Sequence, residues 1–170
     1  GGEVGLLFSA FFWSYSLFQL PSGLLLDRFG IKTVGRWGAF LWTAASGLTA
    51  LSTGYAGLFL ARLTLGLAES PGMIGNQKAT GHWFPRRERS RSTAVFDSAA
   101  KFANVIGVPL VAFFVVRFGW RWGFGVTALF SLGYFIAYWV MYRDPSQDRH
   151  LGRAEHDYIL AGGAVPEGRS

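Results

Sequence analysis

Cysteine is absent from the 170 residues, and charged residues make up only 15% of them, against about 25% in typical soluble domains. Without cysteine, disulfide bonds and thiolate metal sites are excluded, and the redox compartment stays undetermined. Residues 4–26, 37–61 and 122–142 carry no charged side chain at all. Uncharged runs of about 18 residues or more are typical of helices that span a bilayer. We therefore expect an integral membrane protein.

Apolar residues, by contrast, make up 51% of the chain, and their arrangement predicts an all-α membrane protein with five transmembrane helices. The predicted spans are residues 4–26, 37–53, 57–84, 93–118 and 123–142, and the third and fourth contain charged residues. Residues 143–170 are predicted to form a cytoplasmic linker. Five spans are unusual for a self-contained bundle, and the chain begins with Gly1 rather than Met. We therefore expect a fragment of a longer protein.

The formal net charge of +6 suggests nucleic-acid binding at first sight, but the basic residues are sorted by side of the membrane. Loops on one side carry eleven of them and those on the other side carry two. The positive-inside rule assigns the basic side to the cytoplasm, so the N-terminus lies outside and the C-terminus inside. No nucleic-acid partner is expected. The first group is Arg28, Lys32, Arg36, Arg86, Arg87, Arg89, Arg91, Arg143, Arg149, Arg153 and Arg169, and the second is Arg117 and Arg121.

Two opposite charges lie inside the third predicted span. Arg62 and Glu69 are seven residues apart, which puts them on nearly the same helix face, about 10 Å apart along the axis. Because charge in a bilayer is costly, such residues usually face a partner or a water-accessible cavity. Desolvation favours the neutral form of Glu69 and Arg62 favours the carboxylate. A structural ion pair and a proton-binding site therefore both remain open.

Other polar residues belong to the first and fourth spans. Tyr15 and Gln19 are four residues apart and share one helix face, where they offer a hydroxyl and an amide. Asp97, Lys101 and Asn104 form a polar stripe at helical spacing. Lys101 could meet a substrate carboxylate, or Asp97 and Lys101 could simply neutralise each other.

The first predicted cytoplasmic loop contains the pattern G-x-x-x-D-R-x-G-x-K, formed by Gly23, Asp27, Arg28, Gly30 and Lys32. This pattern resembles the loop between the second and third helices of the major facilitator superfamily. The resemblance implies a helix bundle in which the loop takes part in the conformational switch between two cavity orientations.

The rest of the chain is similar to the anion:cation symporter branch of that superfamily, which includes hexuronate, glucarate and galactonate transporters. In this register the chain covers helices two to six of twelve, so that helix one and the second half are missing. The matching stretches are Phe11-Phe12-Trp13-x-Tyr15-x-x-x-Gln19-x-Pro21-x-Gly23, Arg62-x-x-x-Gly66-x-x-Glu69, Trp83-Phe84-Pro85-x-x-x-Arg89, Gly119-Trp120-Arg121 and Ala154-Glu155-x-x-Tyr158-Ile159.

The resemblance implies a secondary active transporter of the plasma membrane, the bacterial inner membrane, that moves a small organic anion by proton symport with alternating access. It implies Glu69 as the proton-coupling carboxylate, Arg62 as its charge partner, and Tyr15 and Gln19 as substrate contacts. Lys101 is an additional candidate for substrate binding, and Asn104 on the same stripe is another. The expected substrate is a hexuronate, aldonate or aldarate, with an aromatic or dicarboxylic acid as the alternative. No cofactor is expected beyond the coupling ion, a proton or alternatively sodium.

Two other classes of protein compete with the transporter. An intramembrane hydrolase requires a nucleophile with a base or a metal cluster, and the sequence offers neither; His82, His150 and His156 lack metal-ligand spacing. The chain is therefore not expected to be an enzyme. A channel or a non-transporting membrane sensor remains the alternative, and accumulation of substrate against a gradient separates a transporter from both.

Overall fold

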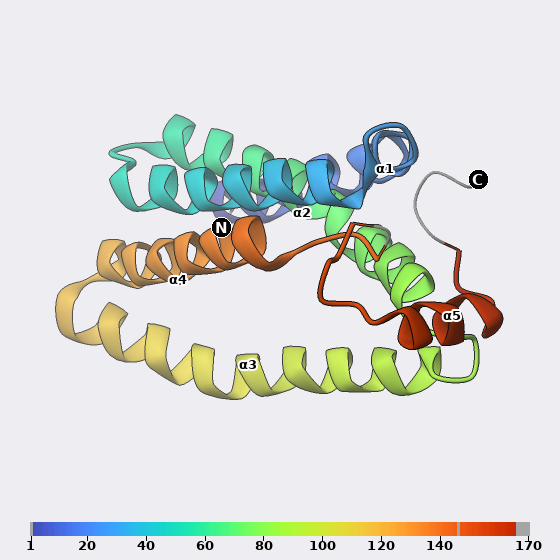
Figure 1. Ribbon diagram of the computed structural model, residues 1–170. Coiled ribbons are helices and arrows are strands. Elements are labelled where there is room, and N and C mark those ends of the chain that lie inside the picture. The colour runs from blue at the N-terminus through green and yellow to red at the C-terminus, as the bar shows by residue number, and fades with distance from the viewer. Residues whose placement is uncertain (1, 146, 166–170) are drawn as a thin grey trace.

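The computed structural model describes residues 2–145 and 147–165, and in these ranges the chain forms α-helices and no strands (Figure 1). The predicted all-α fold is therefore confirmed. Arg169 and the last part of the predicted linker lie outside the described residues. The helices are α1 (Gly2–Leu51), α2 (Tyr55–Trp83), α3 (Arg89–Phe118), α4 (Trp120–Met141) and α5 (Arg153–Ala161).

Helix α1 consists of two arms that meet at Gly30. The backbone there has φ 79° and ψ 162°, a conformation that glycine adopts without strain and side-chain-bearing residues avoid. The first arm, residues 2–29, contains the predicted span 4–26, and the second arm, residues 31–51, overlaps the predicted span 37–53. Gly30 thus turns the chain back with almost no loop, as the sharp bend at the α1 label shows (Figure 1).

Helices α2, α3 and α4 coincide with the remaining three predicted spans to within a few residues. Among the described residues, α1, α3 and α4 are long and apolar enough to cross a membrane. Helix α2, which carries Arg62, Glu69 and Lys78, is not among these three. Its passage through the bilayer remains a prediction.

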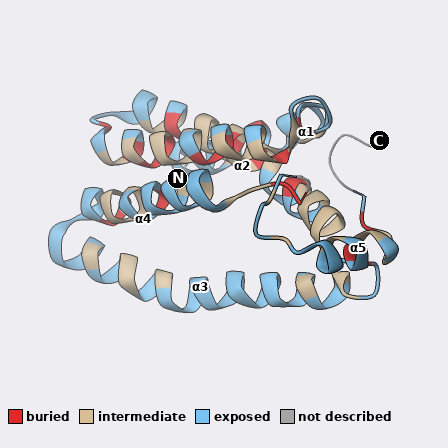
Figure 2. Cartoon of the chain, in the orientation of Figure 1, coloured by how far each residue is buried: buried red, intermediate tan, exposed pale blue. Residues whose placement is uncertain are grey.

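The packed core lies between α1 and α2, and α1 also packs against α4 (Figure 1). Most buried residues of these helices are small, which lets helix backbones approach closely in a membrane. Helix α3 packs along α4, touches α2 only slightly and has no buried residue, so it is coloured exposed or intermediate throughout (Figure 2). The small buried residues include Ala10, Ser14, Ser22, Ala39, Ala45, Gly66, Ala68, Ser70 and Gly75.

Large apolar side chains cover the outside of the bundle. Leu17 is 73% exposed, Leu20 83% and Val116 87%. A soluble protein rarely exposes contiguous apolar surface of this extent. Such a surface is typical of a protein whose exposed side chains contact the acyl chains of lipids.

Candidate functional site

The candidate site begins at the closest approach of α1 and α2. Gly66 of α2 is buried against the first arm of α1, where a Cβ would collide with Ser14 Oγ and the Phe11 carbonyl oxygen. Only glycine permits this distance between the helix backbones. The contact fixes the face of α2 that carries Arg62 and Glu69, since both lie within about one turn of Gly66.

Arg62 and Glu69 do not form an ion pair within 4.0 Å in the described part of the chain, although both are half-buried on α2. The Arg62 guanidinium instead lies over the Phe124 ring of α4, with its Cζ 5.4 Å from the ring centroid. A cation held over an aromatic face gains electrostatic stabilisation without a counter-ion. Glu69 is therefore a carboxylate on an otherwise apolar stretch of α2, with no basic group in direct contact among the residues described.

Tyr15 and Gln19 lie half-buried on the first arm of α1, next to this crossing. The Tyr15 ring stacks on Phe11, with centroids 5.9 Å apart and planes at 19°. A Cβ at Gly66 would be 2.9 Å from the Tyr15 backbone nitrogen. The structure thus places Tyr15 on the same part of the α1–α2 seam as Gly66.

Lys101 and Asn104 lie on α3 and are exposed, as is Asp97. Asp97 and Lys101 make no ion pair within 4.0 Å among the described residues, so they do not neutralise each other by direct contact. Helix α3 has no extensive contact with α1. The structure therefore does not bring the α3 stripe into contact with Tyr15 and Gln19.

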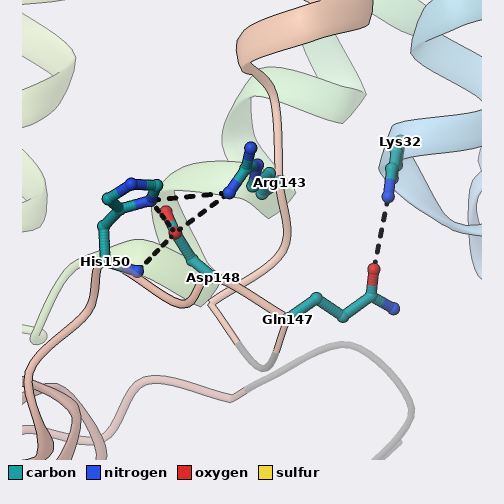
Figure 3. A network of polar contacts seen from close by, with 5 residues as sticks. All are labelled: Lys32, Arg143, Gln147, Asp148 and His150. Atoms are coloured by element: carbon teal, nitrogen blue, oxygen red, sulfur yellow. Dashed lines mark hydrogen bonds and ion pairs between the residues drawn. The ribbon is translucent and has the colours of Figure 1, made fainter.

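The loop motif at the bend of α1 makes specific polar contacts. Asp27 forms an ion pair with Lys78 of α2, which ties the end of the first arm to the C-terminal part of α2. Lys32 donates to Gln147 Oε1 at 3.3 Å, and this contact reaches the segment after α4 (Figure 3). Arg28 and Gly30 line a cavity of about 280 Å³ beside these residues. Gly23, about one turn before Asp27, has no atom within 4 Å of the position that a Cβ would take.

A second polar cluster follows α4, and sequence reasoning did not identify it. Asp148 accepts from the His150 backbone N–H at 3.0 Å, and Arg143 approaches the same carboxylate at 3.8 Å (Figure 3). The hydrogen bond from the His150 N–H, followed by the nearby His150 and Arg143 side chains, lowers the pKa of Asp148. Asp144, whose side chain is 2% exposed, lies 3.8 Å from His82 at the end of α2.

The C-terminal segment docks on the turn between α2 and α3, which the sequence also did not reveal. Arg89 donates to the carbonyl oxygens of Phe84, Gly81 and Gly163, at 3.2, 3.0 and 3.0 Å. The Tyr158 hydroxyl donates to the Glu88 carboxylate at 2.5 Å, and this bond raises the pKa of Tyr158. We call residues 153–165 the tail clasp (Figure 1, red).

No group of three or more His, Asp or Glu side chains that could hold a metal ion is present in residues 2–145 and 147–165. The fold and site define a helical membrane protein with one half-buried carboxylate near a tight helix crossing. The sequence profile described as the Major Facilitator Superfamily matches residues 1–166. The chain belongs to the Major Facilitator Superfamily and is an integral membrane protein.

Curated relatives extend this assignment. The chain is 40% identical to the uncharacterized transporter YybO of Bacillus subtilis (strain 168), over 96% of this chain and 38% of the relative. It is 37% identical to the probable galactarate/D-glucarate transporter GudP of Escherichia coli (strain K12), over 95% and 37%. It is 31% identical to the hexuronate transporter of the same strain, over 94% and 37%.

These matches confirm the resemblance to sugar-acid transporters of the superfamily. The family and the names of its relatives point to a transporter and not to an enzyme. The chain spans less than two fifths of the length of each of these three relatives.

Proposed function

We propose that the protein containing this chain moves a small sugar acid across the plasma membrane by proton symport with alternating access. The single observation that carries the proposal is Glu69, a half-buried carboxylate on α2 without a direct ion pair among the described residues. Support comes from relatives named as galactarate/D-glucarate and hexuronate transporters. Both names refer to polyhydroxylated carboxylates, so a hexuronate, aldonate or aldarate is the proposed substrate class.

Glu69 is proposed as the group that binds the coupling proton. A carboxylate that lies in an apolar surrounding and lacks an opposite charge in contact exchanges protons more readily than one locked in an ion pair. Arg62 acts on Glu69 through space, because its guanidinium is committed to the Phe124 ring. Bound organic anion adds negative charge nearby and favours the protonated form of Glu69, so substrate and proton bind together.

Substrate contacts are assigned to Tyr15 and Gln19 of α1 and to Lys101 and Asn104 of α3. A sugar acid offers hydroxyl groups and one or two carboxylates, which match a phenol, two amides and an ammonium group. The two sets of residues belong to helices that do not pack on each other in this chain. We propose that substrate bridges them in the complete protein.

The loop at the bend of α1 is proposed as the conformational switch. Asp27 pairs with Lys78, and Lys32 with Gln147, so opening of the cytoplasmic side requires contacts among α1, α2 and the segment after α4 to change. Gly30 supplies the bend, Arg28 lies beside it, and Gly23 belongs to the same motif. This loop is placed on the cytoplasmic side, with the N-terminus of the chain outside.

The test uses the full-length protein reconstituted in vesicles, with labelled galactarate, glucuronate and galactonate as probes. Glu69→Gln is expected to abolish accumulation driven by an imposed pH gradient while substrate counterflow continues. Glu155→Gln, an exposed carboxylate on α5, is the matched control and should accumulate substrate as wild type does.

Three results would contradict the proposal. If Glu69→Gln accumulates substrate in response to the pH gradient as wild type does, Glu69 does not bind the coupling proton. Accumulation driven only by a sodium gradient would show that sodium, and not the proton, is the coupling ion. Equilibration without accumulation in wild type would indicate a channel.

A further inference from the structure

Pro71 interrupts the hydrogen bonding of α2 two residues after Glu69. Proline has no backbone N–H, so the carbonyl group four residues earlier, that of Leu67, loses its helical partner. In a bilayer no water replaces that partner, and an unsatisfied carbonyl there destabilises the fold. The Leu67 carbonyl therefore needs another donor.

The structure supplies this donor from a serine side chain. Ser70 Oγ donates to the Leu67 carbonyl oxygen at 2.9 Å, and it lies 2.6 Å from Ser22 Oγ of α1. A hydroxyl group has one proton to donate, and that of Ser70 goes to Leu67, so Ser22 donates to Ser70. Ser70 is 0% exposed and Ser22 is 3% exposed. The three groups form a continuous chain from α1 to the freed carbonyl.

Two further prolines lie inside helices, Pro21 of α1 and Pro109 of α3. These prolines free the carbonyl groups of Leu17 and Val105. Within the described ranges, neither carbonyl accepts a hydrogen bond from a side-chain hydroxyl. The arrangement at Pro71 is therefore specific to this position in α2 and does not accompany every proline in the described helices.

We propose that Ser22 and Ser70 form a hydroxyl relay that replaces the backbone hydrogen bond missing at Pro71, and that they are positioning residues for Glu69. The role for Glu69 rests on the proposed function above. Ser70 and Glu69 are neighbours on one turn of α2, so the backbone that the relay stabilises also sets the depth and direction of the carboxylate.

The second arm of α1 packs against the same part of α2. A Cβ at Gly38 would lie 3.2 Å from the Ala68 carbonyl oxygen and 3.5 Å from Pro71 Cγ. Gly38 is buried there. The proline ring is thus held against the second arm of α1, while Ser22 of the first arm donates to Ser70, whose hydroxyl satisfies the freed carbonyl.

The first test is a double-mutant cycle on the stability of the full-length protein. Ser70→Ala leaves the Leu67 carbonyl unsatisfied and is expected to raise the unfolding equilibrium constant about tenfold or more. In a Pro71→Ala background, the new backbone N–H can reach Leu67, so adding Ser70→Ala should change that constant by less than about threefold.

Ser131→Ala is the matched control for this cycle. Ser131 is also buried, and its hydroxyl donates to the Thr127 carbonyl oxygen at 2.9 Å. That carbonyl keeps its ordinary helical partner, the backbone N–H of Ser131, so this deletion should cost much less than Ser70→Ala. An equal effect of Ser70→Ala in the wild-type and Pro71→Ala backgrounds, or an effect no larger than that of Ser131→Ala, would overturn the relay.

The second test separates positioning from stability. Ser22→Ala and Ser70→Ala are expected to move the midpoint of the pH profile of substrate uptake by about half a pH unit or more, whereas Ser131→Ala leaves it in place. A loss of folded protein alone lowers uptake without moving the midpoint. Unmoved midpoints in both variants would overturn the positioning role. Failure of the proposed function is distinguishable from failure of the relay. It would appear as unchanged pH-driven uptake in Glu69→Gln, and it would not alter the unfolding equilibrium constants of the double-mutant cycle.

Discussion

Replacement of Gly66 by alanine is the sharpest test of the α1–α2 crossing. The added methyl group would collide with Ser14 Oγ and the Phe11 carbonyl oxygen and would approach the Tyr15 nitrogen to 2.9 Å. Two of these three atoms belong to the backbone and cannot turn away as the end of a flexible side chain can. The helices must therefore separate, and overpacking of this kind costs about 1–3 kcal/mol.

Helix propensity acts in the opposite direction. Alanine is favoured over glycine inside a helix by about 0.5–1 kcal/mol, so the net loss for Gly66→Ala is about 0–2.5 kcal/mol. Gly72→Ala in the same helix is the matched control, since Gly72 is exposed and has no atom within 4 Å of its hypothetical Cβ. That variant should gain about 0.5–1 kcal/mol.

The measurement is the free energy of unfolding of the full-length protein in mixed detergent, followed by tryptophan fluorescence. A gain in stability for Gly66→Ala equal to that of Gly72→Ala would refute close packing at the crossing. Ser14→Ala added to Gly66→Ala should restore less than half of the loss, because the Phe11 and Tyr15 backbone atoms remain in place. Full restoration would show that the side chain alone limits the approach.

Two further predictions concern the tail clasp. The Val165 amide donates to the Gly81 carbonyl oxygen and so reports on docking of the tail. Arg89→Lys should lower the hydrogen-exchange protection of this amide about tenfold, because lysine cannot reproduce the three carbonyl contacts of Arg89. Arg91→Ala, at an exposed arginine, is the control and should leave the protection unchanged. For Tyr158, the hydrogen bond to Glu88 raises the pKa in the docked state, so its contribution is complete below the ordinary tyrosine pKa of about 10 and disappears as pH rises through the raised value. A spin label at Ala161 should therefore become more mobile in that alkaline range in wild type, and the same pH response in Tyr158→Phe would contradict this.

The helices and the bend of α1 follow from local features of the sequence. Long uncharged runs predict the spans, and Gly30 in the loop motif marks the point where the chain reverses. These features depend on neighbours in sequence, which is why they can be predicted without a structure.

The partners of the charged residues could not be predicted in the same way. The seven-residue spacing of Arg62 and Glu69 suggests an ion pair, but Arg62 lies over Phe124, a residue of a different helix. Likewise, no spacing in the sequence links Lys78 to Asp27, with which the structure pairs it. Spacing reports which residues share a face, whereas the contact itself depends on what the neighbouring helix presents.

The tail clasp also carries information about the order of assembly. Its bond between Tyr158 and Glu88 joins positions 70 residues apart. Closing a loop of that length in an unfolded chain costs about 4 kcal/mol, more than the roughly 1.5–3 kcal/mol that one hydrogen bond to a charged group contributes. Once α3 and α4 have paired, they bring the chain back to the end of α2, and most of that entropy has already been lost. We therefore expect the tail to dock only after α3 and α4 have paired.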